Sequence, residues 1–359
     1  MTGDMAKMKK HMAFAIMALT GSAMAQSTNG VQIYGIADVA LTHISNTGGN
    51  SRTGLDSGGA SSSRIGLRGR EDLGAGLQVG FTLESTVDLT NGAAGRGTSF
   101  FNREATVSLI SKDWGTLKVG RQLDFLNVDI GVPDAAPIIQ GGQAAGYAGI
   151  AGAPVDVHIG GYQFDNTVKW MKTFGRVTTG LLYGFGAGTE TKGNYVHGAM
   201  INYIDGGLSL GAGYTKDNFS PSNGPFAREA FAVKGMYVTG PWMFLANYYV
   251  GKDPESKAQI KPIELTVAYN FSEKVRVGGG IGVARATNKT GEKATLTQPF
   301  IGAKYNLSKR SHLYTMVSFN KTSDKDAVPS TVGKPGGALW GPSDTDHQSV
   351  IRVGIHHRF

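Results

Sequence analysis

Residues Ile263–Ala284 read IELTVAYNFSEKVRVGGGIGVA, two alternating segments on either side of a short polar turn. In the first segment the odd positions are Ile, Leu, Val and Tyr, while the even positions are polar or small. The alternation resumes in Val275–Val283, after the turn Phe271–Lys274. Successive side chains of a strand point to opposite faces, so the stretch predicts two antiparallel strands, each with one apolar and one polar face.

The same pattern recurs outward from this stretch, for example in Leu77–Glu84 and Ile351–His356, and the connections between such segments alternate in length. Seven are short: Leu73–Gly76, Asp113–Gly115, Thr173–Gly175, Asp205–Gly207, Thr239–Pro241, Phe271–Lys274 and Leu307–Lys309. Eight are long: Ser45–Ala60, Leu89–Phe100, Leu123–Tyr162, Phe185–Asn194, Asp217–Ala227, Gly251–Ile260, Thr287–Ala294 and Lys321–Asp346. Fifteen connections predict sixteen strands.

Two all-β architectures fit alternating strands, a soluble sandwich and a transmembrane barrel. Sandwich strands are usually only about five or six residues long, and their connections need not divide into a short set and a long set. Strands of about ten residues with short turns at one end and long loops at the other are typical of outer-membrane barrels. We therefore predict a 16-stranded antiparallel transmembrane β-barrel with short periplasmic turns and long extracellular loops.

Composition excludes several classes of protein. The 359 residues include 53 Gly and no Cys, and only 17% are charged. Without Cys there is no disulfide scaffold, thiolate metal site or Cys nucleophile. A low share of charge together with abundant Phe and Tyr argues against a disordered chain. The glycine excess favours turns and strands over long helices.

The N-terminus has the layout of a secretory signal peptide. Lys7, Lys9 and Lys10 precede the apolar or small stretch Met12–Met24, and Ala23-Met24-Ala25 is a small-x-small cleavage site before Gln26. The stretch is too short for a membrane helix, and a buried N-terminal helix is the alternative. We expect residues 1–25 to be a signal peptide and residues 26–359 to form the barrel.

The two faces of the predicted strands differ in chemistry. The apolar series ends in aromatic residues near the short turns, at Trp170, Tyr203, Trp242, Tyr269 and Tyr305. Aromatic rings that carry one polar group favour the membrane–water interface, so this face is predicted to contact lipid. The opposite series carries Glu84, Asp88, Lys169, Glu264, Arg276, Lys304 and Arg352. A polar interior in a barrel of this size predicts a water-filled channel.

The sequence resembles the neisserial-type trimeric general porins of β-proteobacteria, from Val31 to Phe359. Four segments carry the resemblance: VQIYGIADVAL (Val31–Leu41), SSRIGLRGREDLGAGL (Ser62–Leu77), FNREATVSLISKDWGTLKVGRQLD (Phe101–Asp124) and the C-terminal RVGIHHRF (Arg352–Phe359). The resemblance implies a sixteen-stranded barrel, a homotrimer and passive diffusion of small hydrophilic solutes and anions. It also implies outer-membrane lipid and lipopolysaccharide as surroundings, and Phe359 as a C-terminal signal for the barrel assembly machinery.

The resemblance further implies that the third long loop, Leu123–Tyr162, folds into the lumen and narrows the pore. Packing against the inner wall accounts for its centre, Ala135–Val155, which has no charged residue and is rich in Gly and Ala. The loop contributes acids and no Lys or Arg; its candidate constriction residues are Asp124, Asp129 and Asp134. The wall contributes bases, and its candidates are Arg64, Arg68, Lys118, Arg103 and Arg121.

Strand parity decides which bases face the lumen. Arg64 and Arg68 alternate with apolar residues and are predicted to point inward, with Arg70 near the periplasmic rim; Lys118 is also in phase with inward positions. Arg103 and Arg121 share parity with lipid-facing residues, so each reaches the lumen only through a bulge or, for Arg103, from above the hydrocarbon band. A plainer interpretation is that these bases only balance inner-wall acids. Acids on the loop facing bases on the wall favour ion selectivity at the narrowest point.

Other functions have weak support. Gly278–Gly282 lacks the final Gly of a nucleotide loop and lies inside a predicted strand. His356 and His357 are adjacent, so they point to opposite faces and cannot share a metal. No Ser/His/acid set has a hydrolase spacing, and the bases form no stripe for nucleic acid. We expect no enzyme activity, cofactor, metal or nucleic-acid partner.

Three functional interpretations remain. The first is a general diffusion porin of the outer membrane with a weak anion preference. The second is a porin of the same fold that prefers a substrate such as an organic acid or phosphate. The third is a structural or adhesive barrel, for which a long pore-narrowing loop has no purpose.

Overall fold

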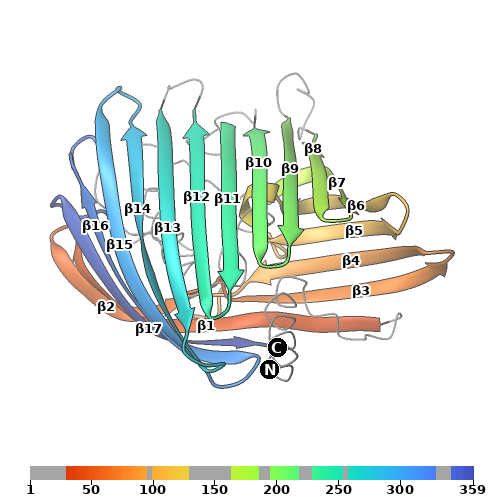
Figure 1. The fold of residues 1–359 in the computed structure, drawn as a ribbon, viewed down its shortest axis with the longest axis horizontal. Helices are drawn as coiled ribbons and strands as arrows, with labels where there is room; N and C mark the ends of the chain where they lie inside the picture. The colour runs from red at the N-terminus through yellow and green to blue at the C-terminus, as the bar shows by residue number, and fades with distance from the viewer. Residues whose placement is uncertain are drawn as a thin grey trace, which may run out of the picture.

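The computed structural model describes residues 30–94, 99–128, 163–185, 195–217, 229–253, 258–328 and 341–359. Within these ranges the strands form one antiparallel sheet (Figure 1). No helix of these ranges is long and apolar enough to cross a membrane, and the helix they contain is the single turn α2, Phe125–Val128. The strands are β1 Gly30–Thr47, β2 Asn50–Ser57, β3 Arg64–Gly74, β4 Leu77–Thr86, β5 Glu104–Ser111, β6 Gly115–Leu123, β7 Gln163–Phe174, β8 Val177–Gly184, β9 Val196–Asp205, β10 Leu208–Asp217, β11 Glu229–Thr239, β12 Trp242–Lys252, β13 Gln259–Asn270, β14 Val275–Thr287, β15 Lys293–Asn306, β16 Ser311–Thr322 and β17 His347–Arg358.

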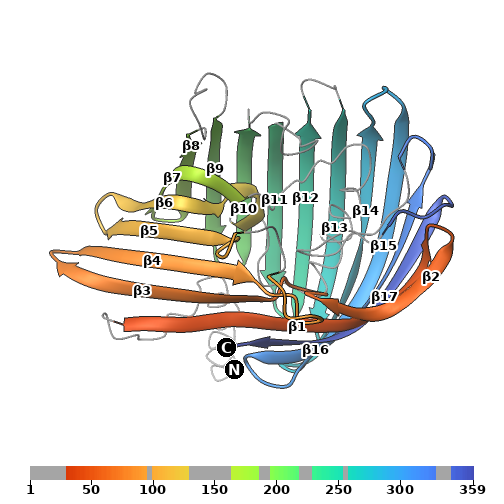
Figure 2. The same ribbon diagram turned by 180° about the vertical axis from the view of Figure 1, so that it is seen from behind.

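The sheet closes into a barrel because β1 pairs with the last strand as well as with its sequence neighbours. Ile36–Ile44 of β1 lies antiparallel to Val350–Arg358 of β17. The other edge of β1 pairs first with β3 and then, further along, with β2. β2 and β3 therefore lie end to end and together take the place of one full-length strand beside β1. The seventeen strands thus form a barrel with sixteen strand positions. This confirms the predicted 16-stranded barrel; Figure 2 shows β1 and β3 to β6 on the wall opposite β9 to β14.

All seven predicted short turns are present, between β3 and β4 and then between every second pair up to β15 and β16. The longer connections lie at the other end. One of them differs in kind from the prediction, and several others differ at their ends by one to three residues. Ser45–Ala60 is not a loop, because Gly48 and Gly49, with φ of 60° and 91°, make a tight turn into β2. The strands around Thr287–Ala294 extend further than predicted and leave a connection of residues 288–292.

The interruption between β2 and β3 forms a short segment, residues 58–63, that folds into the barrel. Four of its six residues are buried and none is fully exposed. Its chain is held by Asp38 of β1, whose carboxylate accepts hydrogen bonds from the amides of Ala60 and Ser61, both at 3.2 Å. The side chain of Asp38 points inward, in phase with the other buried residues of β1. We call residues 58–63 the inner segment.

Exposure alternates along the strands as the pattern predicts. In β13, Ile263 and Leu265 are 46% and 52% exposed on the outer face, whereas Glu264 and Thr266 are buried on the inner face. Trp242, at the start of β12, packs edge-on against Tyr269, with ring centroids 4.7 Å apart beside the short turns. The outer wall is therefore apolar over its middle and aromatic towards the short turns.

The seam of the barrel ends at the C-terminus. The amide of Gly35 donates to the Phe359 carbonyl at 3.1 Å, and the Phe359 amide donates to the Gly35 carbonyl at 3.2 Å. The Phe359 ring covers the Cα of Gly35, so a side chain at position 35 would meet both this ring and the Arg64 carbonyl. The last residue is thus built into the wall.

Candidate functional site

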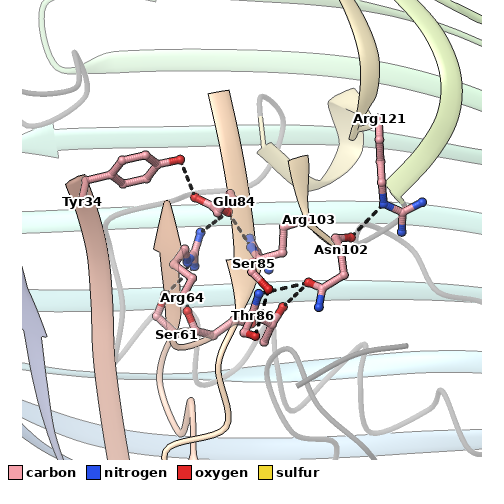
Figure 3. A network of polar contacts seen from close by, with 10 residues as sticks. Tyr34, Ser61, Arg64, Glu84, Ser85, Thr86, Asn102, Arg103 and Arg121 are labelled. Carbon is pink, nitrogen blue, oxygen red and sulfur yellow. Dashed lines mark hydrogen bonds and ion pairs between the residues drawn. The ribbon is translucent and has the colours of Figure 1, made fainter. Parts of the chain in front are cut away.

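A cluster of charged side chains on the inner wall surrounds Glu84 of β4 (Figure 3). The Arg103 Nε lies 2.5 Å from Glu84 Oε1, and the Arg64 Nη1 lies 3.8 Å from the same oxygen. The Tyr34 hydroxyl donates to Glu84 Oε2 at 3.0 Å. Two guanidinium groups therefore share one buried carboxylate, and the cluster carries a surplus of positive charge.

Arg103 reaches this cluster because it precedes the strand. The chain bends at position 103, and β5 begins at Glu104. Its amide donates to the Glu84 carbonyl at 3.1 Å, and its side chain is only 7% exposed. The parity of β5 does not apply to a residue in this bend, so Arg103 points inward although Val107 and Leu109 face outward.

Arg64 is oriented by the inner segment. Its Nε donates to the Ser62 carbonyl at 2.9 Å, and its Nη2 donates to the Ser61 hydroxyl at 3.2 Å. Because Asp38 holds the amide of Ser61, a chain of contacts runs from Asp38 through the inner segment to Arg64 and Glu84.

Asp38 itself is fully buried and accepts two further contacts from distant strands. The Tyr314 hydroxyl donates to its Oδ1 at 2.7 Å, and a 3.0 Å hydrogen bond joins its Oδ2 to Nδ1 of His356. No motif in the sequence points to Asp38 as a site residue. The alternation in β1 predicts that the Asp38 side chain points inward. Its partners Tyr314 and His356 lie hundreds of residues away in sequence, and they come next to it only when the barrel closes.

Arg68 lies four residues after Arg64 along β3, towards the short turns, and it is exposed to the lumen. Its Nε donates to the Gln32 amide oxygen at 2.9 Å, and its guanidinium carbon is 4.8 Å from the centroid of the Tyr34 ring. Both partners are neutral. Arg70 is also exposed, nearer the rim.

Lys118 and Arg121, both on β6, are held by different acids. The Lys118 Nζ donates to Glu104 Oε1 at 2.8 Å on the inner face. The pairing of β6 with β7 shifts between Gly120 and Gln122, and Gly120 has a φ of 124°, so a bulge changes the parity before Arg121. Arg121 then contacts Asp165, 65% exposed, at 2.6 Å, and joins the Glu84 cluster only indirectly, through a 2.9 Å bond to the Asn102 carbonyl (Figure 3).

The start of the third loop lies against the inner wall. Asp124 is buried directly before α2, and the Thr215 hydroxyl of β10 donates to its Oδ2 at 3.3 Å. The Phe125 ring packs on Gly180 of β8 and lies 4.5 Å from the Lys169 Nζ. Asp129 and Asp134, with most of the predicted loop Leu123–Tyr162, lie outside the described residues.

The dismissed motifs also have a place in the fold. Gly278–Gly282 lies inside β14 and is not a loop. His356 is buried on the inner face of β17, whereas His357 is exposed. The predicted opposition of the two rings is confirmed.

A closed barrel with an apolar outer wall and a charged inner wall defines a channel-forming membrane protein. The model of the Gram-negative porin family matches residues 13–325, and the chain belongs to this family. Outer membrane porin protein 32 of Delftia acidovorans is 30% identical over 372 residues, which cover 98% of this chain and 100% of the relative. An outer membrane porin protein of Bordetella pertussis is 27% identical over 413 residues, again 98% and 100%.

Among solved structures, the anion-selective porin from Comamonas acidovorans matches with a TM-score of 0.73 and 26% identity, covering 92% of this chain and 100% of that one. The chain is therefore an outer-membrane porin of a Gram-negative bacterium, as the sequence predicts. Its relatives are channels rather than enzymes.

Proposed function

We propose that this porin forms a water-filled diffusion channel with a weak preference for anions over cations. The observation that carries the proposal is the imbalance of charge around Glu84. Arg64 and Arg103 share that one carboxylate, and Arg68 beside them contacts an amide oxygen and an aromatic ring and has no acidic partner among the described residues. Charged side chains at a narrow place set ion selectivity, so an uncompensated cationic wall favours anions.

The remaining constriction residues complete this proposal. Lys118 is balanced by Glu104, and Arg121 by Asp165, so neither adds to the surplus. Asp124 is turned into the wall of β10, which limits its attraction for cations. Asp129 and Asp134 are proposed as the acids that face the basic wall. The anion-selective Comamonas relative supports the same sign of preference.

The test is the reversal potential of the reconstituted protein in a tenfold KCl gradient across a planar bilayer. We expect a modest chloride preference, and a cation-selective channel would overturn the proposal. A substrate-preferring porin is the second candidate, because two guanidinium groups on one carboxylate also suit a multivalent organic acid or phosphate. Block of the KCl current by a low concentration of such a solute would favour this second function.

We further propose that three copies assemble through the outer wall near the seam of β1 and β17, with Leu89–Phe100 reaching over a neighbour. The resemblance to trimeric porins supports this arrangement. Detergent-extracted protein is expected to migrate as an SDS-resistant trimer until it is boiled. A monomer in several mild detergents would contradict it.

The same proposal covers the route to the membrane and its surroundings. Residues 1–25 lie outside the described residues and are proposed to be a cleaved signal peptide, so the mass of the mature protein should correspond to a chain that starts at Gln26. The barrel assembly machinery is proposed to recognise the C-terminal strand. Lipopolysaccharide is proposed to surround the barrel at its long-loop end.

A further inference from the structure

Four basic side chains gather on the inner wall of β14 to β17, at the short-turn end beside the C-terminus (marked C in Figure 1). They are Arg276, Lys304, His312 and Arg358, one from each strand, and each lies within three residues of that end of its strand. All four are in phase with the buried residues of their strands, so they point into the lumen. We call these four residues the periplasmic cluster, because the short turns of an outer-membrane barrel face the periplasm.

The members of the periplasmic cluster lie close together because their strands are neighbours. Arg276 is directly opposite Lys304 in the pairing of β14 with β15. The positive charges of Lys304, Arg358 and Arg276 all act on the His312 ring. This ring in turn stacks on His356 of β17, with ring centroids 4.5 Å apart. Three permanent positive charges therefore surround one ring of the inner wall.

Acids are scarce around the periplasmic cluster. The strands β14 to β17 contain no Asp and no Glu. Arg276 instead donates from its Nε to the Asn270 amide oxygen at 2.7 Å. Two acids come near. Asp38 of β1 already bonds His356 and the inner segment, and Glu273, in the turn before β14, is exposed and makes no ion pair within the described residues.

The pair of Arg276 and Lys304 defines the chemistry of a ligand. Like charges directly opposite each other destabilise a sheet, and an anion that contacts both relieves their repulsion. Opposed residues of antiparallel strands have Cα atoms about 4.5–5.5 Å apart, so the two head groups can contact two oxygens of one anion. Gly278 and Gly302, next on the inner face and opposite each other, add no side chain that would cover the pair. A guanidinium binds an oxyanion through two hydrogen bonds, and an ammonium adds a point charge.

We infer that the periplasmic cluster is a binding site for small polyvalent oxyanions, of the phosphate or dicarboxylate class, at the periplasmic end of the channel. Arg358 connects this site to the basic wall of the constriction, since Ile36 of β1 pairs with Arg358 on one side and with Arg64 on the other. An anion that leaves Arg64 towards the periplasm therefore meets a second group of cations. The inference rests on the proposal that the barrel conducts solutes, and it adds a site apart from the Glu84 cluster.

The experiment measures how inorganic phosphate reduces the KCl current when it is added to the compartment that holds the short turns. The chain has no Cys, so a biotin on Lys309→Cys identifies that compartment through streptavidin. We expect Arg276→Gln with Lys304→Gln to raise the half-blocking phosphate concentration about tenfold or more. The matched control, Lys112→Gln with Arg176→Gln, removes the same charge from other exposed short turns and should behave as the wild type does. An unchanged half-blocking concentration in the first variant would overturn the site.

A second variant separates loss of charge from loss of structure. Arg276→Lys with Lys304→Arg exchanges the two groups and keeps one guanidinium and one ammonium on the same strands. We expect its half-blocking phosphate concentration to stay within about threefold of the wild-type value. A loss as large as that of the glutamine variant would show that the packing of these side chains, and not their charge, controls the current.

Two further solutes test the class of ligand. Succinate should reduce the current as phosphate does, whereas monovalent acetate should need a concentration about tenfold higher. Equal potency of acetate and succinate would overturn a polyvalent site. Block that persists in the glutamine variant but is lost in Arg64→Gln would place the anion at the Glu84 cluster instead. The reversal potential in a KCl gradient reports the anion preference separately, so a cation-selective wild type with intact phosphate block would overturn only the proposed selectivity.

Discussion

The contribution of a single arginine to ion selectivity depends on the groups that surround its guanidinium. Arg68 contacts an amide and an aromatic ring, and no carboxylate of the described residues pairs with it. Arg70 is exposed closer to the rim, where bulk salt screens it. We expect Arg68→Ser to reduce the chloride preference more than Arg70→Ser does, as measured by reversal potentials in a tenfold KCl gradient. An Arg68→Ser channel with the wild-type potential would remove Arg68 from the constriction.

Asp38 has a structural role, because its carboxylate holds the inner segment in place and does not contact the solute. Its carboxylate accepts from two amides of the inner segment and from the Tyr314 hydroxyl, and it also bonds to His356. An amide in its place turns one acceptor into a donor and leaves about two buried donors unpaired. We expect Asp38→Asn to lower the free energy of unfolding by about 3 kcal/mol, measured by urea unfolding in detergent.

Tyr314→Phe is the control for this residue. It removes one donor and leaves the carboxylate with its remaining partners, so it should cost about 1 kcal/mol. Equal losses in the two variants would show that the inner segment does not depend on the charge of Asp38.

At the scale of elements, the alternation predicted the strands well and the seven short turns almost to the residue. It failed where a strand breaks. Ser45–Ala60 is predicted as one long connection, yet Gly48 and Gly49 close a hairpin and the surplus chain folds inward. The bend at Arg103 and the bulge after Gly120 likewise change which face a side chain takes. Parity arguments hold only inside an unbroken strand, which is why parity alone could not place Arg103 and Arg121.

The closing contact of β1 provides an element-scale prediction. Gly35 passes under the Phe359 ring and against the Arg64 carbonyl, so even a methyl group must displace wall atoms. We expect Gly35→Ala to destabilise the barrel by about 1–3 kcal/mol. Gly54→Ala on β2 is the matched control, because open space surrounds that position, and it should be neutral in the same urea unfolding assay. A neutral Gly35→Ala would contradict the tight seam.

For the whole molecule, the sequence predicts that the barrel closes but not which residues meet when it does. An even number of strand positions and an apolar outer face were readable, and both follow from burying backbone polar groups in lipid. The contacts that closure creates could not be predicted from the sequence. Asp38 contacts Tyr314, 276 positions away in sequence, and Gly35 contacts the last residue. The acidic side of the constriction stays a prediction at Asp129 and Asp134.

The C-terminal residue bears on both the folding of the barrel and its insertion into the outer membrane. Phe359 donates one backbone hydrogen bond to Gly35 and accepts another from it, and the residue stays 45% exposed on the outer side. Deleting Phe359 removes both the seam contact and the exposed ring. We expect little heat-modifiable barrel in outer membranes and an accumulation of periplasmic protein, measured by fractionation and gel shift.

Phe359→Ala separates the two roles, because it keeps the backbone bonds and removes only the ring. If the ring serves recognition by the assembly machinery, this variant should refold normally in detergent yet insert poorly in cells. If the ring serves the seam, both yields should fall together, since Gly35 would lose its cover. Wild-type yields in both assays would show that neither role depends on the aromatic side chain.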